Sequence, residues 1–119
     1  MHNVINWFEI PVADIDRATA FYSTIFDTEL NKLDTDEIMS VFPYQDGVGG
    51  ALVKSATHVP TTEGAVLYLN GGDDLSNVLN RVDSAGGQVA MPKTSIGEIG
   101  FIAFFVDTEG NKVGLHSMN

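Results

Sequence analysis

Cysteine is absent from the 119 residues of this chain, and basic residues are scarce. Without cysteine the chain can form no disulfide, no thiolate metal site and no cysteine nucleophile, and this composition fits a cytoplasmic protein. Only 6 lysine and arginine residues stand against 16 aspartate and glutamate residues, which gives a formal charge of -10. Such a charge repels phosphate backbones and anionic membrane surfaces, so we expect neither nucleic acid nor a membrane as a partner.

Long apolar runs are also missing. No segment approaches the length that crosses a membrane, and the start of the chain lacks the basic region of a signal peptide and carries Glu9 inside its apolar run. The 44% of hydrophobic residues, with 12 glycines and 4 prolines, is nevertheless typical of a folded protein with a real core. We therefore expect one globular domain.

Residues 4–26 predict a strand that leads directly into a helix. Alternation along the strand places Trp7 and Glu9 on the face opposite to Phe8. Asp14 stands where an N-cap carboxylate accepts from free amides, and apolar residues at helical spacing follow it. Because the helix should cover the Phe8 face, Trp7 and Glu9 face away from it, and function is expected on their face.

The remaining chain divides at a polar stretch, residues 55–64, which predicts an internal linker. Before the linker, alternating apolar residues predict three strands, at Leu30–Leu33, Ile38–Tyr44 and Val48–Lys54. After it, the sequence predicts the strand Ala65–Asn70, a helix with its apolar stripe from Leu75 to Ala85, the strand Gln88–Met91, a long loop at Pro92–Gly100, and the strands Phe101–Val106 and Lys112–His116. Asp73 or Asp74 should cap the second helix, and Gly86 should end it.

Each half of the chain therefore reads β-α-β-β-β. When Asp14 is laid on Asp74, the apolar positions of the two helices coincide in pattern more than in identity. The predicted fold class is α+β: module one over residues 1–54 and module two over residues 65–119 form curved mixed sheets around a cavity, with one helix packed outside each sheet.

Two motifs make the chain resemble the glyoxalase, bleomycin-resistance and extradiol-dioxygenase superfamily, also called the vicinal oxygen chelate fold. The first is V-x-D-x-x-R-A-x-x-F-Y, from Val12 to Tyr22, and the second is D-x-E-G-N-x-x-G-L-H, from Asp107 to His116. The likeness covers essentially the whole chain. It implies the paired-module fold, but it implies no single activity, because the superfamily includes isomerases, dioxygenases, thiol transferases and drug-binding proteins without catalysis.

The resemblance also implies where a divalent metal would lie in the enzymatic members. Their His, Gln or Glu ligands come from the first, fourth, fifth and eighth strands, and the matching positions here are Trp7, residues 50–52, Leu67 and Gly114. None of these side chains is a metal ligand of the usual kind. We therefore expect neither a metal nor any other cofactor.

Trp7 is the leading candidate for a ligand contact, with Gly114 leaving room beside it. An indole at this position either stacks on a bound molecule or fills the cavity as core. Leu67 and Leu69 would line the same pocket, and Lys93 and Thr94 in the long loop would contact the ligand from a lid or simply lie exposed.

A proton-transfer pair is the second candidate. If the first and eighth strands are neighbours, Glu9 and His116 could meet in the pocket, although His116 could equally be a surface residue. His2 and His58 are expected to be exposed.

Two functions from different classes follow from these residues. The first is a metal-independent module that binds a small, partly apolar or aromatic molecule in its inner cavity. The second is a superfamily enzyme of the lyase, isomerase or dioxygenase type that acts on a small metabolite through Glu9 and His116. Either would be a homodimer, since open sheets of this superfamily are commonly completed by a second copy.

Overall fold

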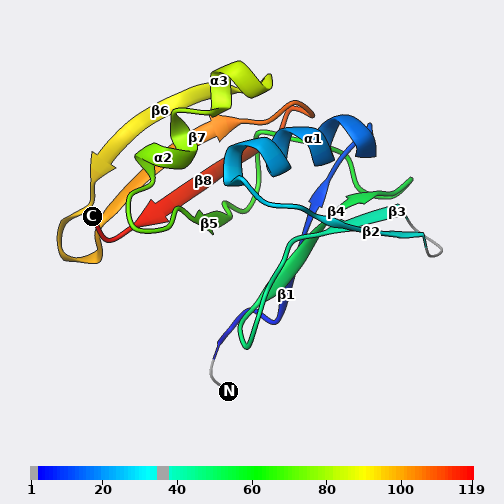
Figure 1. The fold of residues 1–119 in the computed structure, drawn as a ribbon, viewed down its shortest axis with the longest axis horizontal. Helices are drawn as coiled ribbons and strands as arrows, with labels where there is room; N and C mark the ends of the chain where they lie inside the picture. Colours follow the sequence, from blue (N-terminus) through cyan, green and yellow to red (C-terminus); the bar gives the residue numbers. More distant parts are fainter. Residues whose placement is uncertain (1–2, 35–37) are drawn as a thin grey trace.

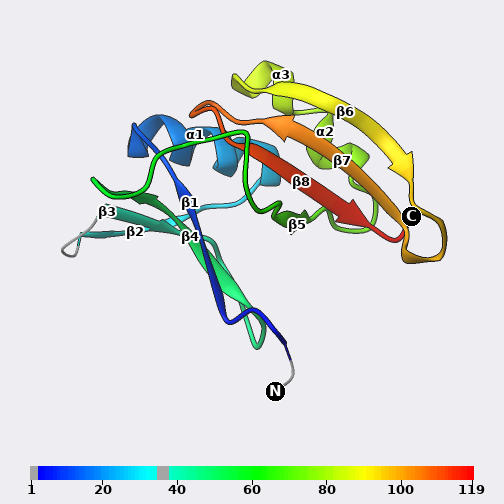
Figure 2. The same ribbon diagram turned by 180° about the vertical axis from the view of Figure 1, so that it is seen from behind.

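The computed structural model describes residues 3–34 and 38–119 of the chain. His2 and most of the acidic turn before Ile38 lie outside the described residues. The fold consists of two four-stranded sheets with strand orders β1-β4-β3-β2 and β5-β8-β7-β6. The two sheets do not close into a barrel within the described residues, and their β1 and β5 edges face the middle of the molecule (Figures 1 and 2). The paired β-α-β-β-β plan is confirmed.

Module one contains β1 (Trp7–Pro11), α1 (Ile15–Phe26), β2 (Asn31–Asp34), β3 (Ile38–Val41) and β4 (Gly49–Lys54). Helix α1 begins as the sequence predicts, because the Asp14 side chain accepts a hydrogen bond from the Arg17 amide at 3.0 Å. Its buried stripe is Ile15, Ala18, Phe21, Tyr22 and Ile25. This stripe gives the helix one apolar face, which packs on β3 and β4.

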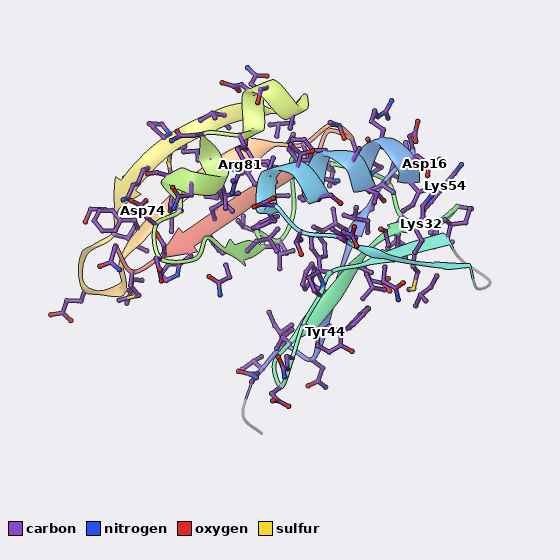
Figure 3. The ribbon with its side chains drawn as sticks, viewed as in Figure 1. Asp16, Lys32, Tyr44, Lys54, Asp74 and Arg81 are labelled. Atoms are coloured by element: carbon purple, nitrogen blue, oxygen red, sulfur yellow. The ribbon has the colours of Figure 1, made fainter. Side chains whose placement is uncertain are left out.

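Module two contains β5 (Tyr68–Asn70), α2 (Ser76–Leu79), α3 (Val82–Ala85), β6 (Gln88–Ser95), a short 3-10 turn at Gly97–Ile99, β7 (Phe101–Val106) and β8 (Lys112–Ser117). One continuous second helix was predicted, and that prediction is wrong. The helical hydrogen bonds shorten to a spacing of three residues at Arg81, whose amide donates to the Val78 carbonyl. The Arg81 side chain also donates from Nε to the Ile25 carbonyl at the end of α1. Figure 3 shows Arg81 between α2 and α1.

The predicted loop at Pro92–Gly100 is also shorter than expected. Strand β6 continues to Ser95, with irregular register against β7. Pro92 is tolerated because β6 is an edge strand, where a missing amide donor costs no ladder hydrogen bond.

A single core joins the two modules. Phe21 and Tyr22 of α1 contact the ring of Phe105 in β7, with centroid distances of 5.8 and 6.1 Å. Tyr22 also packs edge-on against Phe42 near β3, at 5.6 Å. Helix α1 thus lies between the helix-side faces of both sheets, and it also contacts α2 and α3 (Figure 1).

A buried polar network reinforces this joint, and it is built from the two motifs noted in the sequence. The Tyr22 hydroxyl donates to the Asp107 carboxylate at 2.7 Å, and the Asn111 side-chain amide donates to the Pro11 carbonyl at 2.7 Å. Asp107 also accepts from the amides of Glu109 and Asn111. Burial, followed by the charge of Asp107, raises the pKa of Tyr22 well above its ordinary value, so Tyr22 stays a donor.

Glu109 completes the start of α1 from the other module. Its side chain is fully buried and accepts from the amides of Ala13 and Asp14 at 2.9 and 2.8 Å, and from Arg17 Nε at 2.7 Å. Burial alone would raise the pKa of Glu109, but the Arg17 guanidinium and these amides outweigh it and lower the pKa to about 2. The carboxylate therefore stays ionised and satisfies donors that the first helical turn leaves free.

Candidate functional site

Each sheet has a helix-side face and an opposite face, called the open face below, which no helix of the described chain covers. Side-chain exposure separates the two faces in β1: Ile10 is 3% exposed, whereas Trp7 is 40% exposed. The predicted alternation of this strand is confirmed. Trp7 and Glu9 share the open face of sheet one, and the indole Nε1 donates to the Glu9 carboxylate at 3.3 Å.

An aromatic pair on a glycine floor forms the open face of sheet one. Trp7 lies opposite Gly49 in the β1–β4 register, and its ring meets Tyr44 edge-on at 6.0 Å. A Cβ atom on Gly49 would lie 2.5 Å from the Tyr44 ring, so only glycine lets that ring lie flat on the strand. Tyr44 is 57% exposed and stands near the end of the β1–β4 pair (Figure 3). Sequence reasoning missed Tyr44, although the glycines that follow its turn were a usable signal.

The open face of sheet two repeats this arrangement. Gly114 lies opposite Tyr68 in β5 and Phe104 in β7, and these two rings are 5.6 Å apart. A Cβ atom on Gly114 would lie 2.5 Å from the Tyr68 ring. The Lys112 ammonium lies 4.8 Å from the centroid of Phe104, which adds one cation to this face.

The sequence expected Trp7 beside Gly114, and that expectation is wrong within one chain. Trp7 belongs to sheet one and Gly114 to sheet two, and Tyr68 already covers Gly114. Leu67 and Leu69 are not on the open face either: Leu69 is 8% exposed in the core, and Leu67 packs against that core. Counting seven residues back from Asp74 placed Leu67 one residue out of phase, because the N-cap position of α2 is Leu75 rather than Asp74.

The structure also separates Glu9 from His116. Strand β1 pairs with β4, whereas β8 lies between β5 and β7 of the other sheet, so the assumed neighbourhood of the first and eighth strands is wrong. The His116 ring is engaged elsewhere, since its Nε2 lies within hydrogen-bond distance of the Ile99 carbonyl. Glu9 bonds to Trp7 instead. The chain therefore does not assemble the predicted proton-transfer pair.

Lys93 and Thr94 lie in strand β6 rather than in a lid loop. The Lys93 ammonium pairs with Asp74 at 3.0 Å and lies 4.6 Å from the centroid of Phe101, on the helix side of the sheet. Hydrogen bonds from Ser76 and Lys93 lower the pKa of Asp74 to about 2, so the charged carboxylate accepts from the Ser76 amide. The N-cap position of α2 is Leu75, so neither Asp73 nor Asp74 is the predicted N-cap. Thr94 is exposed and bonds to the Pro92 carbonyl. The Lys93–Asp74 ion pair thus links β6 to the turn that precedes α2.

Comparison with known proteins settles the family. The model of the Glyoxalase/Bleomycin resistance protein/Dioxygenase superfamily matches residues 4–115. The chain belongs to this superfamily. A protein of Didymella fabae named "Glyoxylase-like domain-containing protein" is 32% identical over 123 residues, which cover 93% of this chain and 91% of that protein.

One further sequence relative and one solved structure extend this comparison. "Putative glyoxylase CFP32" of Mycobacterium tuberculosis is 30% identical over 118 residues, covering 96% of this chain and 45% of that protein, so the chain spans about half the length of this curated relative. The crystal structure of a glyoxalase/bleomycin resistance protein from Albidiferax ferrireducens superposes with a TM-score of 0.78 at 11% identity, covering 98% of this chain and 100% of that one. At this identity the likeness shows the fold alone.

The superfamily implies a metal site, and the residues present do not fit one. The positions that the resemblance assigns to metal ligands include Trp7, Leu67 and Gly114, and none of these residues carries an imidazole or a carboxylate. Among residues 3–34 and 38–119, no group of three or more His, Cys, Asp or Glu side chains is placed to hold a metal ion. No helix in the same ranges is long and apolar enough to cross a membrane.

Proposed function

We propose that this superfamily member binds a small, partly apolar or aromatic molecule on its open faces without the help of a metal. The observation that carries the proposal is the pairing of exposed aromatic rings with glycines on both sheets: Trp7 and Tyr44 at Gly49, and Tyr68 and Phe104 at Gly114. Trp7 and Gly114 are two of the positions at which the resemblance places metal ligands in the superfamily's enzymes.

The exposure of these rings supports a ligand rather than a core role. Trp7, Tyr44 and Tyr68 are 40%, 57% and 44% exposed. Clustered exposed aromatic groups of this size usually mark a binding surface, because hydration of their apolar surface is unfavourable and a planar ligand that stacks on them removes this surface from water. The bond from the indole to Glu9 keeps the Trp7 ring oriented, which lowers the entropy cost of binding.

We further propose that two copies of the chain form a homodimer and that the open faces contribute to its cavity. Both open faces are uncovered within the described part of one chain, and the free β1 and β5 edges leave each sheet incomplete. A two-fold dimer is the commonest way in which such surfaces are covered. We also propose a cytoplasmic location, which is consistent with the absence of cysteine.

The binding proposal can be tested through Trp7, which is the only tryptophan in the chain. A library of aromatic and aldehyde compounds should contain molecules that change its emission saturably. Tyr44→Leu keeps the reporter and should weaken such binding by about three- to tenfold, as expected for the loss of one stacking contact. Val59→Leu is the control, because Val59 is 74% exposed outside both aromatic pairs.

Trp7→Leu should weaken the same binding in a thermal-shift assay without unfolding the protein. The proposal fails if Trp7→Leu unfolds the chain while no compound changes the emission, because Trp7 would then be a core residue. Stoichiometric metal in the purified protein, lost together with an activity on chelation, would remove the claim of metal independence. Sedimentation that shows only a monomer at micromolar concentration would remove the dimer.

A further inference from the structure

A cleft of about 660 Å³ opens between the helix-side face of sheet one and the β5 edge of sheet two. It lies on the opposite side of sheet one from Trp7 and Tyr44, and neither of these residues lines it. Its volume falls in the range of small-molecule sites. Its apolar lining includes Phe8, Phe26 and Phe42 from module one and Leu67 and Leu69 from module two.

Three phenylalanine rings from module one form the floor of this cleft. Phe8 lies 5.7 Å from Phe42, and Phe26 meets Phe42 edge-on at 6.3 Å, measured between ring centroids. The Phe8 ring lies directly on Gly50, where a Cβ atom would come within 2.2 Å of it. With any other residue at position 50, the Phe8 ring would have to move away from the strand.

The opposite wall comes from module two and is equally apolar. Leu67 and Leu69, which the sequence placed in the ligand pocket, line this cleft rather than the open face. The polar side chains of the lining, apart from the Tyr68 phenol, are Thr28 and the amides of Asn3 and Asn70. All of these are uncharged.

The lining contains no Asp, Glu, Lys, Arg or His among the described residues, in a chain where 18% of the residues are charged. A charged ligand would leave water here without meeting an opposite charge, and that desolvation is costly. An uncharged, mainly apolar ligand instead meets aromatic and aliphatic surface, and Thr28 and the asparagines can accept or donate a hydrogen bond.

We propose that this cleft is a second binding site for an uncharged and mainly apolar small molecule. It shares Gly49 and Tyr68 with the open faces but is built mainly from the phenylalanine rings and leucines of the helix-side faces. In this site the three phenylalanine rings contact the apolar body of the ligand on one side, and Leu67 and Leu69 of module two contact it on the other. Because both modules contribute to the cleft, an occupant would also hold the modules together.

Two fluorescent probes that differ by one charged group test this proposal. N-phenyl-1-naphthylamine is neutral, and 8-anilino-1-naphthalenesulfonate has the same aromatic skeleton with an added sulfonate. Titrations in about 0.3 M NaCl screen the net charge of the protein, so that the local lining decides the outcome. We expect saturable, blue-shifted emission from the neutral probe and at least tenfold weaker binding of the sulfonate.

Variants then assign the probe to the cleft. Val48→Trp adds bulk at the cleft rim, where Val48 is 36% exposed, and should weaken binding of the neutral probe at least fivefold. Val59→Trp is the matched control and should leave binding unchanged, because Val59 is an exposed residue outside the lining.

Three results would overturn the proposal. The first is the absence of saturable binding, or equal affinity for the two probes. The second is loss of binding in Trp7→Leu with full binding in Val48→Trp, which would place the probe on the open face. The third is a dimer that Val48→Trp converts to a monomer, which would make a second copy of the chain the occupant.

Discussion

Module one contains one continuous helix of 12 residues, whereas module two has two helices of 4 residues each in the corresponding place. The strands of both modules follow the same order, so the difference lies in how each sheet is covered. Helix α1 packs on its own sheet and also contacts Phe105 of the other. One helix therefore does much of the packing that two equal helices would share.

This asymmetry explains where the polar bonds between the modules concentrate. Module two supplies Asp107, Glu109 and Asn111 from one turn, and these side chains bond to Tyr22, to Arg17 and the start of α1, and to the Pro11 carbonyl. The long helix thus depends on the partner module for its start. The superfamily motifs recognised in the sequence consequently have a structural role in this chain.

Asp107→Ala should produce the largest loss of stability. Asp107 is 5% exposed and accepts four hydrogen bonds, from Tyr22, Glu109 and Asn111. Removing it leaves these buried donors without partners, and we expect a loss of about 3 to 5 kcal/mol in denaturant unfolding. Asp73→Ala is the control, because Asp73 is exposed and should change stability by less than about 0.5 kcal/mol. A near-neutral Asp107→Ala would contradict the role assigned to this polar network in joining the modules.

Glu109→Gln should have an intermediate effect that depends on pH. The folded pKa of Glu109 is about 2 and its ordinary value is 4.5, so its stabilisation is complete above about pH 5 and is lost as the pH falls toward 2. After allowing for the exposed Arg17 partner, we expect a deficit of about 2 kcal/mol at pH 7. Unfolding curves of the wild type and the variant should converge near pH 2. A constant deficit across this range would contradict the assignment.

Two buried serines, one in each module, should give the smallest effects and opposite signs. In module two, Ser117 Oγ accepts from the Leu75 amide at 3.0 Å, so Ser117→Ala should cost about 1 to 2 kcal/mol. In module one, Ser40 Oγ is buried without a hydrogen-bond partner among the described residues. Ser40→Ala should therefore be neutral or stabilise the protein by up to about 1 kcal/mol in the same unfolding assay.

Much of the fold could be predicted because local signals agreed. The Asp14 cap, the apolar stripe of α1 and the left-handed Gly86 at the end of α3 are all present as predicted. The errors lie where tertiary contacts override local preference. The second helix breaks at Arg81, which bonds to the end of α1, and β6 extends through Pro92 because its outer edge is free.

The candidate site was harder to predict, because it depends on which sheets the strands join. Alternation placed Trp7 on the open face, but the pairing of Trp7 with Gly114 and of Glu9 with His116 required β1 and β8 to share a sheet. Leu67 was misplaced because the count started from Asp74, whereas the N-cap position of α2 is Leu75. Tyr44 was predicted as the last residue of the strand Ile38–Tyr44, but β3 ends at Val41, and the contact of Tyr44 with Trp7 forms in the connection that follows.

The turn that holds α1 also affects the order in which the chain can fold during synthesis. The bond between Pro11 and Asn111 joins residues 100 positions apart, and those from Glu109 to Ala13 and Asp14 span 96 and 95 positions. Until the ribosome has made the Asp107–Asn111 turn, the nascent module one therefore lacks the partners that complete the start of α1, and the α1 rings that contact Phe105 remain uncovered. Such long-range closure slows folding and leaves the early half open to chaperones or to another nascent copy.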